Sequence, residues 1–395
     1  MKTLLVMAAA LAATSPAAAF PTMIRHGYAS CQACHVDPSG AGQLTAYGRA
    51  QSDLLVAWHV DPAVIAEGEP AATTGFLFGL VPVPDELNLS GNLRGGGLYN
   101  MNTAGVGAGV RPLLMAADAR ATLQVGWALA HLALGYAPKN VGPAAVVSVN
   151  SGPDNALVSR EHWLGVRFLD DEITLRAGRL PLPFGLRNNE HIALVRDLTR
   201  TDINVDQQHG VALAFNTDGL RAEVMGIVGN FQIRPALFHE RGYSGFVEWA
   251  PAANLAVGAS SLMTWADKDI DAAVPLWRQS HGLFARYAPM QSVAILAETD
   301  VIAHVASPGA IDVGGAGWLQ VDVEPVQGLH IAPALEMAQL DTTAAFPTSG
   351  GWLTAAWYPL PHTELRADVA YRQAFPLAGP SVGTFTALLQ VHLFL

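Results

Sequence analysis

The chain contains two cysteines, and both lie in one short motif, Cys31-Gln32-Ala33-Cys34-His35. A Cys-x-x-Cys-His motif is the attachment signature of a c-type haem. Two thiols at this spacing bond to the two vinyl groups of one porphyrin, and the histidine that follows ligates the iron. We therefore expect Cys31 and Cys34 to hold one covalent haem c, with His35 as the proximal ligand of its iron.

Three other chemistries use paired cysteines. A redox Cys-x-x-Cys belongs in a thioredoxin-like βαβ context, which this sequence does not show. A zinc site needs further ligands at suitable spacing. A plain disulfide between Cys31 and Cys34 does not require a histidine at the next position. Haem attachment is the interpretation that uses all three residues of the motif.

The sixth ligand of the iron has three candidates near the motif: Met23, His26 and His59. A second histidine gives a lower potential, and a methionine raises it. His59 lies in an apolar stretch with the pattern of a short helix, where a packed or surface histidine is the commoner outcome. His26 is only five residues before Cys31, so the chain must wrap around the porphyrin for it to reach the far face. Met23 also suits a core position, and an open or water-ligated iron is a further alternative.

The other histidines are scattered, and we assign no catalytic residue. The sequence has no Ser-His-Asp order, phosphate loop or paired-carboxylate pattern at recognisable spacing. We expect most of these histidines to lie in a lumen or in loops rather than to ligate iron: His131, His162, His209, His281, His330, His362 and His392.

The composition limits the kind of protein that carries this motif. Of 395 residues, 51% are hydrophobic and 14% are charged, and the net charge is −11. A disordered chain needs low hydrophobicity and high charge, and a nucleic-acid-binding chain needs a basic surface, so both classes are excluded. Beyond residue 19 the long uncharged stretches are broken by Pro, Gly or polar residues, whereas a membrane-spanning helix needs roughly 18 or more apolar residues. A secreted or membrane β-protein remains.

The first residues have the order of an export signal. Lys2 precedes an apolar stretch too short to span a bilayer, and an Ala-x-Ala cleavage site follows at residues 17–19. We expect residues 1–19 to be removed, so that the mature chain begins at Phe20, and we regard an N-terminal core helix as the alternative. Export agrees with the motif, because c-type haem is attached outside the cytoplasm.

Three regions are expected in the chain: a monohaem cytochrome segment at 20–75, a linker at 76–85 and a β-barrel at 86–395. A segment as small as the first buries little apolar surface. Haem must therefore form much of its core, or the segment must pack against the remainder of the protein.

Alternation of apolar and polar residues predicts strands from residue 86 onward, because a period of two marks strands with one apolar and one polar face. We place sixteen strands there, within a range of about 14 to 18. Short turns, such as 169–171 and 251–252, alternate with long loops, such as 181–207 and 303–313. Short periplasmic turns, longer outer loops and an even strand number are typical of bacterial outer-membrane barrels. A soluble β-sandwich or propeller is the alternative.

Two further features agree with an outer-membrane barrel. The last predicted strand runs to the end of the chain with Phe394 as its penultimate residue, and such barrels usually close with a strand that ends in an aromatic residue. Aromatic residues near the predicted strand ends are expected to form interfacial girdles, with ordinary sheet packing as the alternative: Trp249, Trp277, Tyr287, Trp357 and Tyr358.

With the haem motif and the barrel together, the chain resembles the fused monohaem cytochrome–porins of bacterial outer membranes, an iron-oxidase-type family. Arg25, the motif at 31–35, the Leu-Thr-Ala-Tyr-Gly-Arg segment at 44–49 and the porin-like segment at 177–186 carry this resemblance. The chain departs from the family at Ala46, where a proline often precedes the aromatic-Gly-Arg unit. The resemblance implies electron transfer through the outer membrane, oxidation of ferrous iron outside the cell in some members, and a cytochrome that plugs the barrel.

The first functional hypothesis is an electron conduit. A barrel of about 16 strands leaves an aqueous channel, and a haem inside it shortens both electron-transfer steps across a hydrocarbon layer of about 30 Å. The partners expected are an extracellular electron donor or acceptor, a periplasmic electron carrier and outer-membrane lipid, with no nucleic acid. The alternatives are a solute porin whose haem segment is a plug or sensor, and a soluble periplasmic haem protein. The donor and the direction of flow stay open.

The predicted loop at 181–207 is polar and contains Arg187, Arg196 and Arg200. These arginines give it the charge to fold inward and contact the haem propionates. A solvated outer loop with internal salt bridges is the commoner arrangement for such a segment, and we expect it here.

Overall fold

The computed structural model describes most of the chain. The predicted export signal at 1–19 and the candidate ligand His59 lie outside the described residues. The described residues are 21–40, 42–58, 75–103, 108–136, 157–187, 193–203, 206–231, 238–307, 309–340, 347–376 and 379–394.

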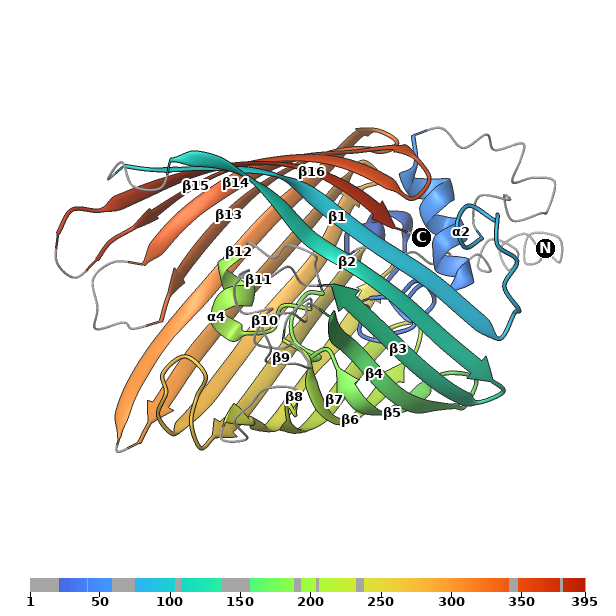
Figure 1. Ribbon diagram of the computed structural model, residues 1–395, viewed down its shortest axis with the longest axis horizontal. Helices are drawn as coiled ribbons and strands as arrows, with labels where there is room; N and C mark the ends of the chain where they lie inside the picture. The colour runs from blue at the N-terminus through green and yellow to red at the C-terminus, as the bar shows by residue number, and fades with distance from the viewer. Residues whose placement is uncertain are drawn as a thin grey trace, which may run out of the picture.

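Sixteen antiparallel strands form one closed barrel, in which each strand pairs with its neighbours in the sequence and β16 pairs with β1 (Figure 1). The predicted class and strand number are confirmed. Closure leaves no free sheet edge, as lipid surroundings require. The strands are β1 (Leu87–Asn102), β2 (Gly109–Val125), β3 (Ala128–Tyr136), β4 (Leu157–Phe168), β5 (Ile173–Leu180), β6 (Gln208–Asn216), β7 (Leu220–Gly229), β8 (Arg241–Ala252), β9 (Leu255–Ala266), β10 (Leu276–Met290), β11 (Val293–Ala306), β12 (Ala310–Val326), β13 (Leu329–Gln339), β14 (Thr348–Leu360), β15 (Thr363–Ala374) and β16 (Val382–Phe394).

Short turns and longer connections alternate around most of the barrel. Residues 253–254 connect β8 to β9, whereas residues 181–207 connect β5 to β6. One predicted long loop is wrong: β11 and β12 stay paired up to Ala306 and Ala310, so most of 303–313 is strand. The turn between them contains Gly309 at a φ of 133°, a backbone conformation that favours glycine.

The strands present an apolar face outward and a polar face inward. In β5, Leu175 is exposed, whereas Thr174 and Arg176 are buried. A soluble sheet buries its apolar face, so this pattern belongs to a barrel whose outer surface meets lipid. Tyr358 is buried rather than part of a girdle, because it follows the exposed Trp357 and therefore faces the other side. The remaining predicted girdle residues are exposed: Trp249, Trp277, Tyr287 and Trp357.

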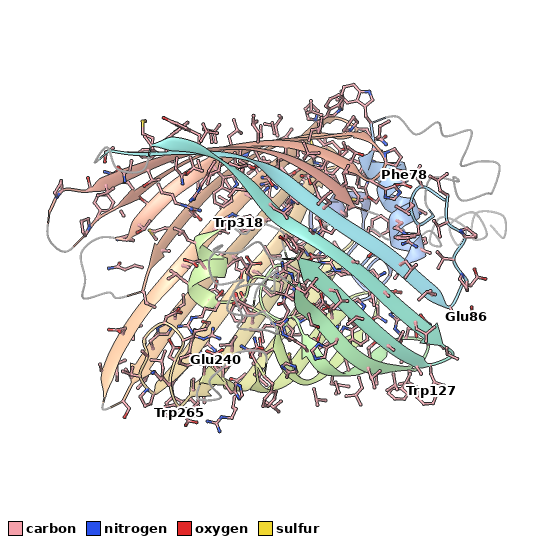
Figure 2. All side chains as sticks on the ribbon, viewed as in Figure 1. Phe78, Glu86, Trp127, Glu240, Trp265 and Trp318 are labelled. Carbon is pink, nitrogen blue, oxygen red and sulfur yellow. The ribbon has the colours of Figure 1, made fainter. Side chains whose placement is uncertain are left out.

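Figure 2 shows the same division between the two faces of the wall. Trp127, in the short turn after β2, lies on the outside of the barrel and is 65% exposed, whereas Trp318 of β12 lies inside and is 3% exposed. The soluble sandwich or propeller is excluded, because the sixteen strands close into one barrel with an apolar outer face.

Residues 21–58, here called the plug, lie at the end of the barrel where the short turns are (Figure 1). The plug contains the short helix η1 (Pro21–His26) and the helix α2 (Ala46–Val56). The side chain of Gln327, in the turn between β12 and β13, donates a hydrogen bond to the carbonyl oxygen of Ala57 at 2.9 Å. No helix among the described residues has the length and apolar character needed to cross a membrane.

The described residues of the connection between β5 and β6 (181–187, 193–203 and 206–207), here called the inward loop, fold into the barrel. The helix α4 (Leu194–Thr199) of this loop lies against β11, β12 and β13 (Figure 1). Ala193 and Val195 are fully buried and share one apolar cluster with Trp318 and Trp352 of the wall. The expected solvated outer loop is therefore wrong, because the segment has an apolar face that packs on the wall.

Candidate haem-binding site

The predicted haem motif forms one helical turn of the plug. The backbone N–H groups of Cys34 and His35 donate to the carbonyl oxygen of Cys31 at 3.1 and 2.9 Å. Residues three and four apart share one side of a helical turn. The turn therefore brings two thiols and one imidazole to the same side, as attachment of one porphyrin through two vinyl groups requires.

Helix α2 fixes the position of this turn. Thr45 caps the helix, because its Oγ1 accepts a hydrogen bond from the N–H of Gly48 at 3.0 Å. The backbone N–H of Thr45 donates a hydrogen bond to the carbonyl oxygen of Cys34 at 2.8 Å. A Cβ atom at Gly48 would overlap that same carbonyl oxygen. Gly48 thus lets α2 touch the motif directly, which explains the presence of a glycine in the segment at 44–49.

The two thiols differ in exposure. Cys34 is fully buried and Cys31 is half-buried, and neither is in a disulfide. Burial, with a smaller effect of Cys31, raises the pKa of the Cys34 thiol to about 12, so this thiol is protonated at neutral pH. The thiolate is the form that exchanges disulfides and binds metal ions. A protonated Cys34 therefore makes disulfide exchange at this residue slow.

Arg25 ties η1 to the barrel wall. Its guanidinium donates to Asp322 and, from Nη1 to Oε2 at 3.1 Å, to Glu324, both of β12. The three side chains are each less than 10% exposed. A buried arginine is stable only when its charge is paired and its donors are bonded. Arg25, one of the residues that carry the resemblance, therefore fixes where the plug docks.

A second group of charges holds the segment that follows the motif. Asp37 accepts a hydrogen bond from the N–H of Ser39 at 2.9 Å and pairs with Arg176 of β5 at 3.1 Å. Arg176 also donates to Glu223 of β7 at 2.5 Å. Burial alone would raise the pKa of Asp37, but Arg176 and Arg187 outweigh it and lower that pKa to about 2. Asp37 is therefore ionised at neutral pH and joins the plug to the wall.

The inward loop supplies the three arginines predicted to contact haem propionates. Two of them pair with carboxylates of the wall and of another loop: Arg196 with Glu298, and Arg200 with Asp269 at 2.7 Å. Arg187 is buried, and its charge acts on the aspartate of the plug. The structure thus brings Arg187 to the plug and places Arg196 and Arg200 in ion pairs.

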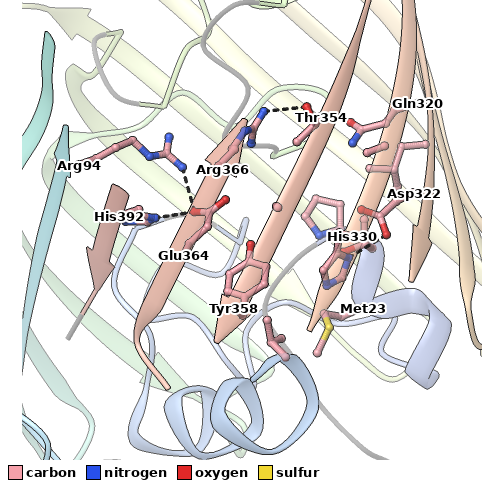
Figure 3. A pocket seen from close by; sticks show the side chains of 16 residues that line it. Met23, Arg94, Gln320, Asp322, His330, Thr354, Tyr358, Glu364, Arg366 and His392 are labelled. Carbon is pink, nitrogen blue, oxygen red and sulfur yellow. Dashed lines mark hydrogen bonds and ion pairs between the residues drawn. The ribbon is translucent and has the colours of Figure 1, made fainter. Parts of the chain in front are cut away.

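A cavity of about 90 Å³, lined by both charged and apolar side chains, lies between the plug and the inner wall (Figure 3). Met23 and Val56 line it from the plug and Tyr358 from β14, and all three belong to the same buried cluster as Cys34. This cluster connects the cavity to Cys34, although Cys31, Cys34 and His35 do not themselves line it. Its charged and imidazole side chains come from β1, β12, β13, β15 and β16: Arg94, Asp322, His330, Glu364, Arg366 and His392.

The donor set and its arrangement fit a covalent haem. Two cysteines and a histidine share one turn, and Cys34 packs in one buried cluster with Met23, Val56 and Tyr358, which line a cavity. The volume of that cavity is smaller than the roughly 300–1,000 Å³ typical of small-molecule sites. Admitting a porphyrin therefore requires side chains at the boundary between plug and wall to move.

The structure separates the predicted sixth ligands. Met23 is buried and lies at the cavity. His26 instead points to the turn between β10 and β11, where Gln291 lies 3.5 Å from its Nδ1. Of the two residues, the structure brings Met23, and not His26, to the cavity.

Two histidines that were expected in the lumen or in loops line the cavity. His330 and His392 were expected to be lumen or loop residues without a role in ligation, and both reach the cavity from the wall. Strand alternation contained part of the signal, because it predicts their inward direction. It did not predict that the plug would dock beside them.

No protein-family model matches the chain, and no curated protein sequence matches it. Solved porins resemble the structure over 78% of the chain. They include the outer-membrane channel DcaP of Acinetobacter baumannii (11% identity, TM-score 0.57, 97% of that chain), OmpT of Vibrio cholerae (12%, 0.59, 99%) and an anion-selective porin from Comamonas acidovorans (10%, 0.58, 99%). At these identities the likeness shows a shared fold. The chain is a porin-type barrel, and its apolar outer face and closed sheet place it in the outer membrane.

Proposed function

We propose that the protein transfers electrons across the outer membrane through a single haem c, bound by Cys31 and Cys34 and ligated by His35. One observation carries the proposal: the turn that holds Cys31, Cys34 and His35 lies in a plug bound to the inner wall of a porin-type barrel. Bound there, the haem supplies a one-electron couple between ferric and ferrous iron. The resemblance to cytochrome–porins supports the same function.

An electron-transfer partner can approach the haem motif from either end of the barrel, and the two ends suit different kinds of partner. Short turns of outer-membrane barrels face the periplasm, and the plug lies at that end. Ala33, inside the motif, is exposed there, and the Gln32 side chain bonds to the carbonyl oxygen of Asp171 in the turn between β4 and β5. A periplasmic electron carrier therefore has access to the edge of the motif.

An extracellular partner has to approach from the other end of the lumen. The hydrocarbon layer is about 30 Å thick, and the inward loop lies between the outer end and the plug. A small donor, such as the ferrous iron that the resemblance suggests, suits this route better than a protein. The protein is then an electron-transfer protein that oxidises an extracellular donor.

A solute porin with a haem-bearing plug is the second candidate function. The fold of the solved porins supports it. The described part of the lumen, however, holds both the plug and the inward loop, and wall residues such as Asp322 and Glu298 bind these two segments. This arrangement favours the conduit.

The test uses the full-length protein in sealed vesicles of known orientation. We expect a membrane-impermeant reductant added outside to produce the haem α-band, followed by reduction of an acceptor trapped inside. A His35→Ala variant whose barrel is shown to fold should lose both the low-spin haem spectrum and the electron transfer to the trapped acceptor. A haem that stays oxidised in vesicles that leak small solutes would favour the porin. No α-band under any reductant would overturn the haem assignment itself.

A further inference from the structure

The segment just before β1 exposes a run of apolar side chains. Residues 76–84, here called the apolar turn, contain no polar side chain. A single exposed apolar residue is normal on a protein surface, whereas a contiguous exposed patch marks contact with another molecule. Four side chains of the apolar turn are between 37% and 82% exposed: Leu77, Phe78, Leu80 and Val81.

The backbone of the apolar turn has a conformation that bulky residues rarely adopt. Leu77 and Phe78 have φ angles of 51° and 58°, in the left-handed region. The N–H of Leu80 closes the turn by donating to the carbonyl oxygen of Leu77 at 3.1 Å. Backbone strain of this kind is found where a segment is held ready to bind. Here the strained residues present their side chains to the surroundings instead of burying them in the protein.

The apolar turn lies beside the plug. The ring of Phe78 meets the ring of His362 edge to face, with 5.4 Å between centroids, and His362 lies 3.5 Å from Asp53 of α2. Figure 2 shows Phe78 at the end of the barrel that holds the plug. Helix α2 also touches the carbonyl oxygen of Cys34 in the haem motif. A molecule bound at the apolar turn therefore lies next to the helix that positions the motif.

The exposed charges at this end of the barrel have one sign. The plug contains two arginines, Arg25 and Arg49, and both are buried. The short turns between strands contain no Lys or Arg, and Arg167 at the end of β4 pairs with Asp171 at 3.5 Å. Of the described residues in the plug, the short turns and the segment before β1, the exposed charged ones are all acidic: Asp85, Glu86, Asp170, Asp171, Glu172 and Asp218.

The other end of the barrel exposes charges of both signs. Arg111 and Arg241 are exposed there, and so are Asp267 and Asp271. The acidity therefore belongs to the plug end and not to the surface as a whole. A surface of one sign steers partners of the opposite sign toward it. Anionic lipid headgroups attract basic segments, so carboxylates beside the apolar turn favour a cationic protein over a membrane surface.

We infer that the apolar turn and the acidic residues around it form the docking surface for a positively charged periplasmic protein. The inference rests on the proposed function, and it gives the periplasmic electron carrier its chemistry: a surface rich in Lys or Arg around a redox centre. Apolar side chains form the centre of the contact and carboxylates its rim, as in other protein interfaces. The carboxylates speed the encounter, whereas Phe78 and Leu80 slow dissociation.

The experiment measures association and dissociation of a probe with the full-length protein in nanodiscs of phosphatidylcholine, a lipid without net charge. The probe is mitochondrial cytochrome c, which is rich in lysine, and its control is the same protein with succinylated lysines. We expect only the lysine-rich probe to bind, and its association to slow as salt is added.

Variants separate the two parts of the surface. Asp85→Asn combined with Glu86→Gln should slow association about tenfold. Leu80→Ser should speed dissociation about tenfold and leave the salt dependence of association unchanged. Asp271→Asn, at the other end of the barrel, is the matched charge control and should change neither rate. Heat-modifiable mobility on gels confirms a folded barrel for each variant.

Four results would overturn the inference: no binding of the lysine-rich probe, equal binding of the succinylated probe, wild-type rates in both surface variants, or a lipid adduct in a crosslinking test. In that test a photoreactive benzoylphenylalanine replaces Leu80, and illumination should join it to the bound probe. An adduct with phospholipid alone would assign the apolar turn to the membrane. A probe that docks as expected but exchanges no electrons is a different failure, because the docking surface then stands and the proposed electron transfer falls.

Discussion

The plug and the inward loop both enter the lumen, and arginine–carboxylate pairs fasten both to the wall. Arg25 of the plug reaches Asp322, and Arg196 of the loop reaches Glu298. The surroundings of the two pairs differ. The loop buries apolar residues such as Val195 in a wall cluster, and the plug buries Met23 and Ile24 in two other clusters with the wall. Arg25 pairs with two carboxylates, Asp322 and Glu324, and the plug also borders a cavity with charged side chains in its lining.

A buried ion pair adds little net stability over an apolar substitute, and its clearest contribution is a defined position. Apolar burial contributes about 25 cal/mol per Å². Both segments have both contributions. Loss of a charge should affect the plug more than the loop, because Arg25 pairs with two buried carboxylates and Arg196 with one.

The largest effect is expected at the motif. Cys34→Ser and Cys31→Ser together should abolish covalent haem, because no thioether bond can form. The mass of the mature chain should then fall by one haem, and the haem stain of the denatured protein should disappear. The barrel should still fold, because the strands pair independently of the motif. A haem that stays covalently bound in the double variant would contradict the site.

The comparison of plug and loop is tested by removing one arginine from each. Arg25→Met leaves Asp322 and Glu324 buried without their cation, and breaking such a pair costs about 3–5 kcal/mol. We expect the plug to become sensitive to protease added at the short-turn side. Arg196→Met is the matched variant, and its plug should stay protected. Equal protection of the plug in both variants would show that the Arg25 pair does not fix the plug.

Local patterns were sufficient to predict the barrel. Alternation in segments such as Ile173, Thr174 and Leu175 reveals strand faces, and turn residues between the segments give the strand number. The haem motif is equally local, because its meaning lies in five consecutive residues. Strand alternation and the haem motif depend on residues that are neighbours along the chain, so they can be recognised from the sequence alone.

Features that depend on distant partners were not predictable. The charge of Arg196 suggested a solvent-exposed side chain. Its partner Glu298 lies about a hundred residues away in the sequence, so the buried ion pair was not visible there. The place of His330 beside the plug was not predictable, since it depends on where the plug docks and on Arg25, 297 positions from Asp322. The haem cofactor itself stays a prediction, which the spectroscopic experiments test.

A smaller effect is expected from pH. Burial raises the pKa of Asp53 in α2 to about 7, against the opposing effect of Arg49, while an unfolded aspartate titrates near 3.9. The docked plug thus keeps a proton that the released plug loses. Docking should be strongest below about pH 4 and weaken as pH rises to about 7, by at most about 4 kcal/mol.

Asp53→Asn should remove most of this pH dependence, because the amide keeps the shape and cannot ionise. The measurement is the urea concentration at which the plug becomes protease-sensitive, followed from pH 4 to pH 8. His362, in the turn between β14 and β15, lies 3.5 Å from Asp53, so His362→Gln is the control for titration of the imidazole. A pH dependence that survives in Asp53→Asn and vanishes in His362→Gln would assign it to the histidine.

The smallest effect concerns the contact between α2 and the motif. Gly48→Ala adds a Cβ where the carbonyl oxygen of Cys34 already lies, and overpacking of this kind costs about 1–3 kcal/mol. Gly97→Ala is the matched control, because a Cβ at that position of β1 meets nothing within 4 Å. We expect Gly48→Ala to release the plug at lower urea and to broaden the haem spectrum, since the turn that holds Cys34 and His35 must shift. Gly97→Ala should change neither. If both variants release the plug at the same urea concentration, α2 can move away from the motif without loss of stability. The tight contact at Gly48 would then have no part in positioning the haem ligands.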